Sequence, residues 1–107
     1  MAAAPTRAFD TELEFVSMLL NPAYVQWLSN EGLLSQAPFL RYLRALHETW
    51  RQPAYAAHLP WPAALTVLEL LAWDADFRAA AAAPAFAHHL LARTAAAAAA
   101  AGAGGRG

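Results

Sequence analysis

Prolines constrain the fold of this chain more than any other feature. Six of its seven prolines lie between residues 22 and 84, and the longest proline-free stretch between them is residues 63–83. Proline removes a backbone donor and breaks a helix interior, but it is well tolerated in the first helical turn. The residue before a proline is also pushed out of the α region. The spacing therefore predicts short helices that begin at prolines.

The apolar periodicity between the prolines agrees with helices. Residues 38–50 are the most regular segment, because Phe39, Tyr42, Leu43, Leu46 and Trp50 recur at close to 3.6 residues. Asn21-Pro22 ends a first helix, and Gly32 is suited to end the second in a left-handed conformation. We expect helices from residue 10 or 11 to 20, over 22–30, 38–50, 62–73 and 84–93, a helical turn at 54–58, and a restart at Asp74 or Asp76.

The residues available for a core point to the same fold class. The chain has three valines and no isoleucine, which is unfavourable for strands, but it has 16 leucines and 12 aromatic residues. Its 30 alanines add little to a core. We therefore predict an all-α, compact single-domain bundle of about four main helices with proline-containing connections. Residues 1–8 are expected to be a disordered lead, 9–93 the helical bundle, and 94–107 a low-complexity Ala/Gly tail that is frayed or disordered.

Composition excludes several classes of protein. There is no cysteine, so that neither a disulfide framework nor a zinc–thiolate site can form. The net charge is −1, which gives no electrostatic footprint for nucleic acid. The start of the chain does not have the pattern of a secretory signal, and prolines interrupt the longest uncharged windows. We expect an intracellular, reducing compartment.

The histidines do not form a recognisable catalytic or metal-binding motif. His47-Glu48 begins like the H-E-x-x-H zinc motif, but Arg51 stands next to the place of the second histidine, which is absent. His88 and His89 are adjacent, so on a helix they point about 100° apart and cannot share a metal. We therefore expect no catalytic residue, no metal and no cofactor. An enzyme would require His47, Glu48 and His58 to meet in one cleft.

A nucleic-acid-binding helical module is a further alternative. Such a module needs a basic face, and Arg41, Arg44 and Arg51 are the one local cluster of basic residues. The balance of charge is against it, because the eight acidic residues outnumber the seven arginines. We expect no direct contact with nucleic acid.

Aromatic residues repeatedly stand beside the prolines. Tyr24, Phe39, Trp50, Tyr55 and Trp61 all lie within three residues of a proline. Each ring could simply pack in the core or staple a loop. Alternatively, some of the rings could line an exposed groove, since such grooves hold extended proline-rich peptides, whose polyproline II conformation is already ordered. Tyrosine and tryptophan can also donate hydrogen bonds to the peptide's carbonyl groups.

The order of these motifs resembles the Mediator subunit 31 family, also called the Soh1 family. The resemblance covers about residues 9–91, and it rests on the ordered set at near-fixed spacing rather than on any single motif. The chain departs from the family pattern at Trp61-Pro62, where Tyr-Pro is expected. The matching elements are Glu12-Leu13-Glu14-Phe15-Val16, Leu20-Asn21-Pro22-x-Tyr24, Leu28, Gly32, Phe39-x-x-Tyr42-Leu43, Trp50-x-x-Pro53-x-Tyr55, Leu59-x-Trp61-Pro62, Leu65-x-x-Leu68-Glu69-Leu70-Leu71 and Phe77-Arg78.

This resemblance implies a non-enzymatic structural subunit of the middle module of Mediator, the nuclear coactivator that links transcription activators to RNA polymerase II. It implies an extended, proline-rich N-terminal segment of Mediator subunit 7 as the partner, together with other middle-module subunits, and neither a membrane nor a small-molecule substrate. The alternative is a helical peptide-binding adaptor outside Mediator. The residues expected to bind the partner are Tyr42, Trp50, Tyr55 and Trp61, followed by Tyr24, Trp27 and Phe39.

Overall fold

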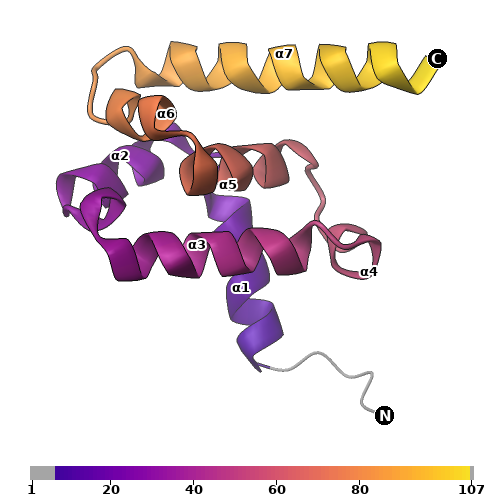
Figure 1. Cartoon of the computed structure of the whole chain (residues 1–107), viewed down its shortest axis with the longest axis horizontal. Coiled ribbons are helices and arrows are strands. Elements are labelled where there is room, and N and C mark those ends of the chain that lie inside the picture. The colour runs from indigo at the N-terminus through magenta and orange to yellow at the C-terminus, as the bar shows by residue number, and fades with distance from the viewer. Residues whose placement is uncertain (1–6, 107) are drawn as a thin grey trace.

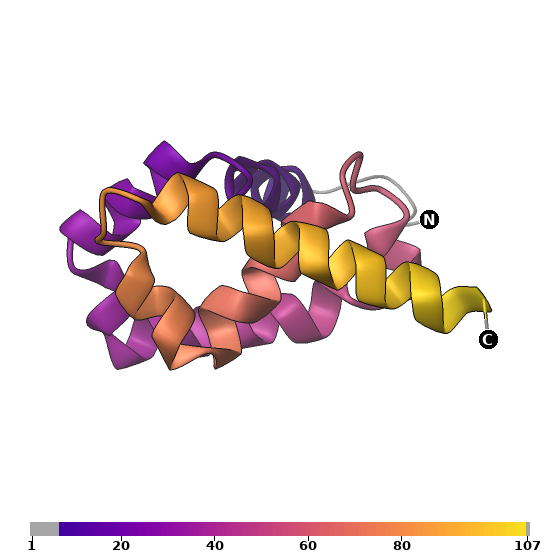
Figure 2. The ribbon, with the colours of Figure 1, turned by 90° about the horizontal axis from the view of Figure 1, so that it is seen from above.

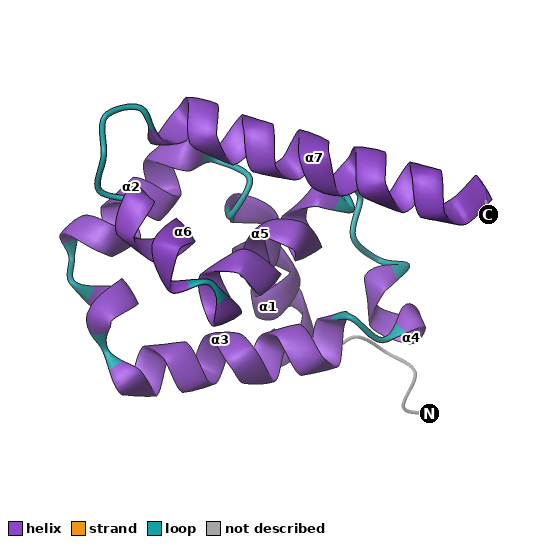
Figure 3. Ribbon diagram, turned by 45° about the horizontal axis from the view of Figure 1, so that its top comes forward, coloured by secondary structure: helices purple, strands orange, loops and turns teal. Residues whose placement is uncertain are grey.

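A computed structural model describes residues 7–106, and the side chains of residues 9–100, as a helical protein (Figure 1). Within this range there is no strand, which confirms the all-α class, although the seven α-helices exceed the predicted four main ones. Figure 3 shows short loops between successive helices. The elements are α1 (Arg7–Met18), α2 (Pro22–Asn30), the 3₁₀ turn η1 (Leu33–Ser35), α3 (Ala37–Trp50), α4 (Pro53–Ala56), α5 (Ala63–Trp73), α6 (Ala75–Ala80) and α7 (Phe86–Arg106).

Several helices begin at the predicted prolines. Pro22 opens α2, and the Asn21 side chain caps that helix by accepting a hydrogen bond from the Ala23 amide at 3.0 Å. Pro38 lies in the first turn of α3, and Pro53 opens α4. Gly32 has φ +79°, a left-handed conformation that glycine adopts without strain, and it lets the chain turn from α2 into η1. The proline pattern thus predicted these boundaries correctly.

The core forms where α3 and α5 pack side by side, which is the most extensive helix–helix contact in the structure. α5 buries Val67, Leu68 and Leu71 completely, and α1 and α2 add further buried leucine and valine side chains. The predicted central position of the 62–73 helix is therefore confirmed. The largest fully buried side chains are Trp50, Phe77, Phe86, Leu19, Leu28, Leu43, Leu68, Leu71, Val16, Val25 and Val67.

The junction between α5 and α6 is held by polar contacts to the end of α5. Arg44 of α3 donates through Nε to the Ala72 carbonyl, and Arg78 of α6 donates through Nη1 to the Leu71 carbonyl, each at 2.9 Å. Both contacts satisfy carbonyl groups that have no partner within a helix. Asp74 then caps α6 by accepting from the Phe77 amide at 3.0 Å, as the predicted restart at Asp74 requires.

The last helix, α7, passes over the other helices and extends beyond them (Figure 2). Its attached part buries Phe86 and Leu90, and Phe86 meets Phe77 of α6 at 5.4 Å between ring centroids. His89, which is partly exposed, contacts the same Phe77 ring at 5.6 Å. α7 therefore connects to the core through its first turns.

The end of α7 corrects the predicted conformation of the tail. We expected a frayed or disordered tail over 94–107, but the helix continues to Arg106. The physical reason is that alanine has the highest helix propensity, and a helix already started at Phe86 needs no new nucleus. The predicted lead, residues 1–8, lies outside the described residues except that Arg7 and Ala8 open α1. None of the helices described here is long and apolar enough to cross a membrane.

Candidate functional site

Five aromatic rings from three helices meet at one surface, which we call the five-ring patch. Phe15 of α1 lies in the middle, with ring centroids 6.2 Å from Tyr24 of α2 and 6.4 and 6.0 Å from Phe39 and Tyr42 of α3. Trp27 of α2 extends the patch by stacking on Tyr24 at 5.8 Å and an interplanar angle of 18°. The patch thus brings together four of the seven predicted binding residues.

The patch is half open to solvent. Trp27 is 50% exposed and Tyr42 is 43% exposed, whereas Phe15, Tyr24 and Phe39 are partly buried and pack against the core. Large rings that touch one another and still face water form an apolar surface of the kind that binds another chain. The inner three rings fix the positions of the outer two.

The tyrosine hydroxyl groups of the patch remain protonated. Burial raises the pKa of the Tyr24 phenol above its ordinary value of 10.0. Burial also raises the pKa of Tyr42, with smaller contributions from the charge of Glu12 and from Tyr24. Both phenols are therefore hydrogen-bond donors at neutral pH, as recognition of a peptide carbonyl requires.

Neither Phe15 nor its neighbour on α1, Met18, was among the predicted binding residues. Phe15 lies at the centre of the patch, and Met18, one turn later on α1, is 44% exposed. Residues three apart on a helix lie on the same face. The spacing of three residues places Met18 on the same face of α1 as Phe15. That Phe15 contacts the rings of α2 and α3 is shown only by the packing of the three helices.

Trp50 is the clear correction to the predicted site. Its side chain has no solvent exposure, and its Nε1–H donates to the Glu12 Oε1 atom at 3.0 Å. Phe9 covers the indole from α1 at a centroid distance of 5.3 Å, and Tyr55 of α4 meets it at 5.4 Å. Trp50 therefore belongs to the core and cannot line an open groove in this structure. Tyr55 is partly buried against the same cluster.

Trp61 lies apart from both clusters. It is 63% exposed in the Pro60-Trp61-Pro62 segment before α5, and no ring contact of the described residues involves it. Flanking prolines restrict the backbone around it. Trp61 is thus an isolated exposed ring on a stiff loop, separate from the five-ring patch.

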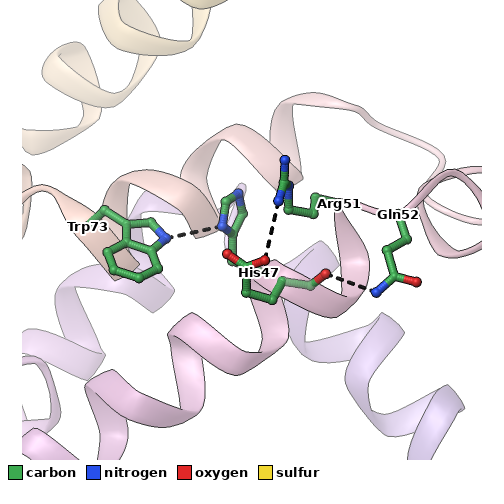
Figure 4. Close-up of polar contacts among 5 residues, drawn as sticks. His47, Arg51, Gln52 and Trp73 are labelled. Atoms are coloured by element: carbon green, nitrogen blue, oxygen red, sulfur yellow. Dashed lines mark hydrogen bonds and ion pairs between the residues drawn. The ribbon is translucent and has the colours of Figure 1, made fainter.

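The residues considered for metal binding or catalysis have other roles here. His47 Nδ1 accepts a hydrogen bond from the Trp73 indole at 3.1 Å (Figure 4). Glu48 pairs with Arg51 at 3.3 Å, and its carbonyl accepts a hydrogen bond from Gln52. Across the part of the chain that the structure describes, no group of three or more His, Asp or Glu side chains is placed to hold a metal ion.

Two arginines of the suggested basic cluster are also engaged. Arg44 lies over the Trp73 ring, with Cζ 4.8 Å from its centroid, and its Nε bonds to Ala72. Arg51 is paired with Glu48. These contacts engage Arg44 and Arg51 within the protein, whereas Arg41 is exposed.

These features define a class of protein: a small helical protein whose distinctive surface is aromatic. Comparison with known sequences then identifies the family. The family described as Med31 (SOH1) matches residues 6–101, which is most of the chain, and the chain belongs to this family.

Individual relatives agree with this assignment. The chain is 44% identical over 66 residues to "Mediator of RNA polymerase II transcription subunit 31" of Danio rerio, covering 62% of this chain and 48% of the relative. Proteins of the same name are similar in Mycosarcoma maydis, at 43% over 86 residues (80% and 56%), and in Kluyveromyces lactis, at 48% over 68 residues (63% and 53%). The chain spans about half the length of the curated relatives it matches.

Proposed function

We propose that this protein is a non-enzymatic subunit of the Mediator coactivator that acts in the nucleus in RNA polymerase II transcription. Membership of the Med31 family and the names of its relatives support this role. We further propose that its partner is the extended, proline-rich N-terminal segment of Mediator subunit 7, with contacts to other middle-module subunits. The single observation that carries the binding role is the half-exposed five-ring patch.

The chemistry of the patch suits such a segment. Proline rings pack flat on aromatic faces, and the polyproline II conformation is ordered before binding, which lowers the entropy lost on association. Trp27 and Tyr42 are the proposed anchors, because they are the exposed rings, whereas Tyr24 and Phe39 form the floor. Trp61 and Tyr55 are proposed to bind a further part of the same segment. Trp50 supports the site from the core.

The test is co-expression of the full chain with the proline-rich segment, followed by size-exclusion chromatography and calorimetric titration. Trp27→Ala and Tyr42→Ala should each weaken binding by about 2 kcal/mol or more, since exposed aromatic anchors dominate interfaces of this kind. The matched control is Leu91→Ala, which truncates another exposed apolar side chain on α7.

The outcome separates the candidate functions. Loss of binding in both patch variants, with an unchanged circular dichroism spectrum and an unaffected Leu91→Ala control, supports the proposal. Binding that survives both substitutions would show that the patch is not the binding surface. If the segment of subunit 7 does not bind but an unrelated proline-rich peptide does, the adaptor outside Mediator is the better assignment.

A further inference from the structure

A cleft of about 600 Å³ lies between the end of α5, the start of α6 and the middle of α7. Its walls include Glu69 and Trp73 of α5, Asp76 of α6, and Arg93 and Ala97 of α7. None of these residues belongs to the five-ring patch, so the cleft is a separate feature. The alanines of α7 keep it open, because a methyl group does not fill the space between the two helices.

The cleft carries uncompensated negative charge. Its lining includes three carboxylates and one guanidinium. Arg93, the single cation of the cleft lining, donates to Asp74 Oδ2 at 2.9 Å. Asp74 is also the carboxylate that caps α6. Within the residues that the structure describes, neither Glu69 nor Asp76 makes a side-chain hydrogen bond or ion pair, and both are exposed. Two carboxylates are therefore left to bind a cation from elsewhere.

An aromatic wall stands beside these carboxylates. Trp73 is 52% exposed, yet its indole is held in place by the hydrogen bond to His47 and by Arg44, which lies over the ring. Figure 4 shows Trp73 directed toward His47 from the neighbouring helix. A fixed ring costs less conformational entropy on binding than a mobile one. Trp73 thus offers an ordered apolar surface next to free negative charge.

The structure assigns this cleft to an arginine side chain, flanked by apolar residues, in a segment of a partner protein. An arginine satisfies both walls at once, since its planar guanidinium bonds carboxylates and stacks on aromatic rings, whereas an ammonium group is a compact point charge. Arg44 already makes this stacking contact with Trp73. A metal ion is the poorer occupant, because no group of three or more His, Asp or Glu side chains in the described residues is placed to hold one.

The experiment titrates the full, isotope-labelled chain with the peptide acetyl-Leu-Arg-Leu-amide and follows the indole N–H signals by NMR. Trp73→Phe identifies the Trp73 signal. The control ligand is the same peptide with citrulline, which has the shape of arginine but no charge. We expect a saturable shift of the Trp73 signal with the arginine peptide, and binding at least about tenfold weaker with citrulline, because charged hydrogen bonds are the stronger ones.

Matched variants locate the site. Glu69→Gln with Asp76→Asn should weaken arginine-peptide binding at least about tenfold, whereas Glu14→Gln with Glu31→Gln removes two exposed charges elsewhere and should leave it unchanged. Ala97→Phe tests the space alone, since it fills the cleft and keeps every charge, and it should abolish binding.

This inference would be overturned by no saturable shift of the Trp73 signal, by equal binding of the two peptides, or by equal losses in the cleft pair and the control pair. Persistent binding by a folded Ala97→Phe protein would equally exclude the cleft. None of these results bears on the five-ring patch, whose test uses a different ligand and different variants.

Discussion

The five-ring patch and the pair Phe77–Phe86, which joins α6 to α7, both connect helices through aromatic contacts. They differ in how much of each ring faces solvent. In the patch, Trp27 and Tyr42 leave about half of their surface exposed. Phe77 of α6 and Phe86 of α7, in contrast, are fully buried. A ring buried on folding stabilises its own chain, because its apolar surface is removed from water. An exposed ring can still have its apolar surface buried by a partner. Substitutions at the two regions should therefore affect different quantities.

The largest loss of stability is expected at Trp50, which was predicted to bind a partner but is fully buried. Trp50→Ala removes a fully buried indole and leaves Glu12 without its donor. It should lower the free energy of unfolding by about 3–5 kcal/mol, as measured by urea denaturation followed by circular dichroism. Trp27→Ala, the control in the patch, should cost about 1 kcal/mol or less. Equal costs would mean that the patch is part of the core.

A loss of about 3 kcal/mol is expected for Phe86→Ala. The Phe86 ring is fully buried against Phe77, and it lies in the first turn of α7, where that helix is attached to the core. Hydrogen exchange should show faster exchange along α7 than in α3 and α5, because the helix can detach while α3 and α5 remain packed. Uniform acceleration in all helices would instead show that α7 unfolds only with the whole domain.

The sequence predicted boundaries better than surfaces, and particular residues show why. Pro22, Pro38 and the cap at Asp74 act on their own neighbours, so their effects can be inferred locally. Trp50 and Trp61 both lie within three residues of a proline, yet Trp50 is buried and Trp61 is exposed. The difference arises because Phe9, far away in sequence, covers Trp50. Burial is decided by such contacts between helices.

The five-ring patch and the cleft both depend on contacts between helices, which the sequence predicts only in part for the patch and not at all for the cleft. Four residues of the patch were predicted to bind a partner, on the resemblance to the Mediator subunit 31 family. Its central ring, Phe15, was not predicted to bind, because only the packing of α1 against α3 brings it there. The cleft was not predicted at all, since it unites residues 66–76 with residues 93–97. Neither segment contains a sequence motif that indicates contact with the other.

A smaller effect separates the attached and the extended parts of α7. Ala98→Gly lies on the exposed part of the helix, after Leu90, which is the last buried residue among the described side chains. Glycine should reduce helix stability there by about 1 kcal/mol relative to alanine. We expect lower helicity by circular dichroism and faster exchange after residue 98, with no change in the unfolding transition of the core. A lower transition midpoint would show that this part of α7 also supports the core.

The smallest effect concerns the ion pair that ties α7 to α6. The Arg93 guanidinium, helped by the Phe77 amide, holds the pKa of the Asp74 carboxyl below its ordinary value of 3.8. A group whose pKa is lower in the folded state stabilises the protein above its unfolded pKa, and this contribution is lost as the pH falls through the folded pKa. Wild type should therefore lose this contribution below about pH 4.

Asp74→Asn isolates the charge, because asparagine also caps a helix but cannot pair with Arg93 as an ion. At neutral pH this variant should be slightly less stable than wild type, because solvent-exposed ion pairs contribute little to stability. Below pH 4 the two stabilities should converge, when measured by urea denaturation across that range. If the difference stayed constant with pH, Asp74 would act on α6 through its capping geometry alone, and the attachment of α7 would depend on the buried Phe86 and Leu90 side chains rather than on charge.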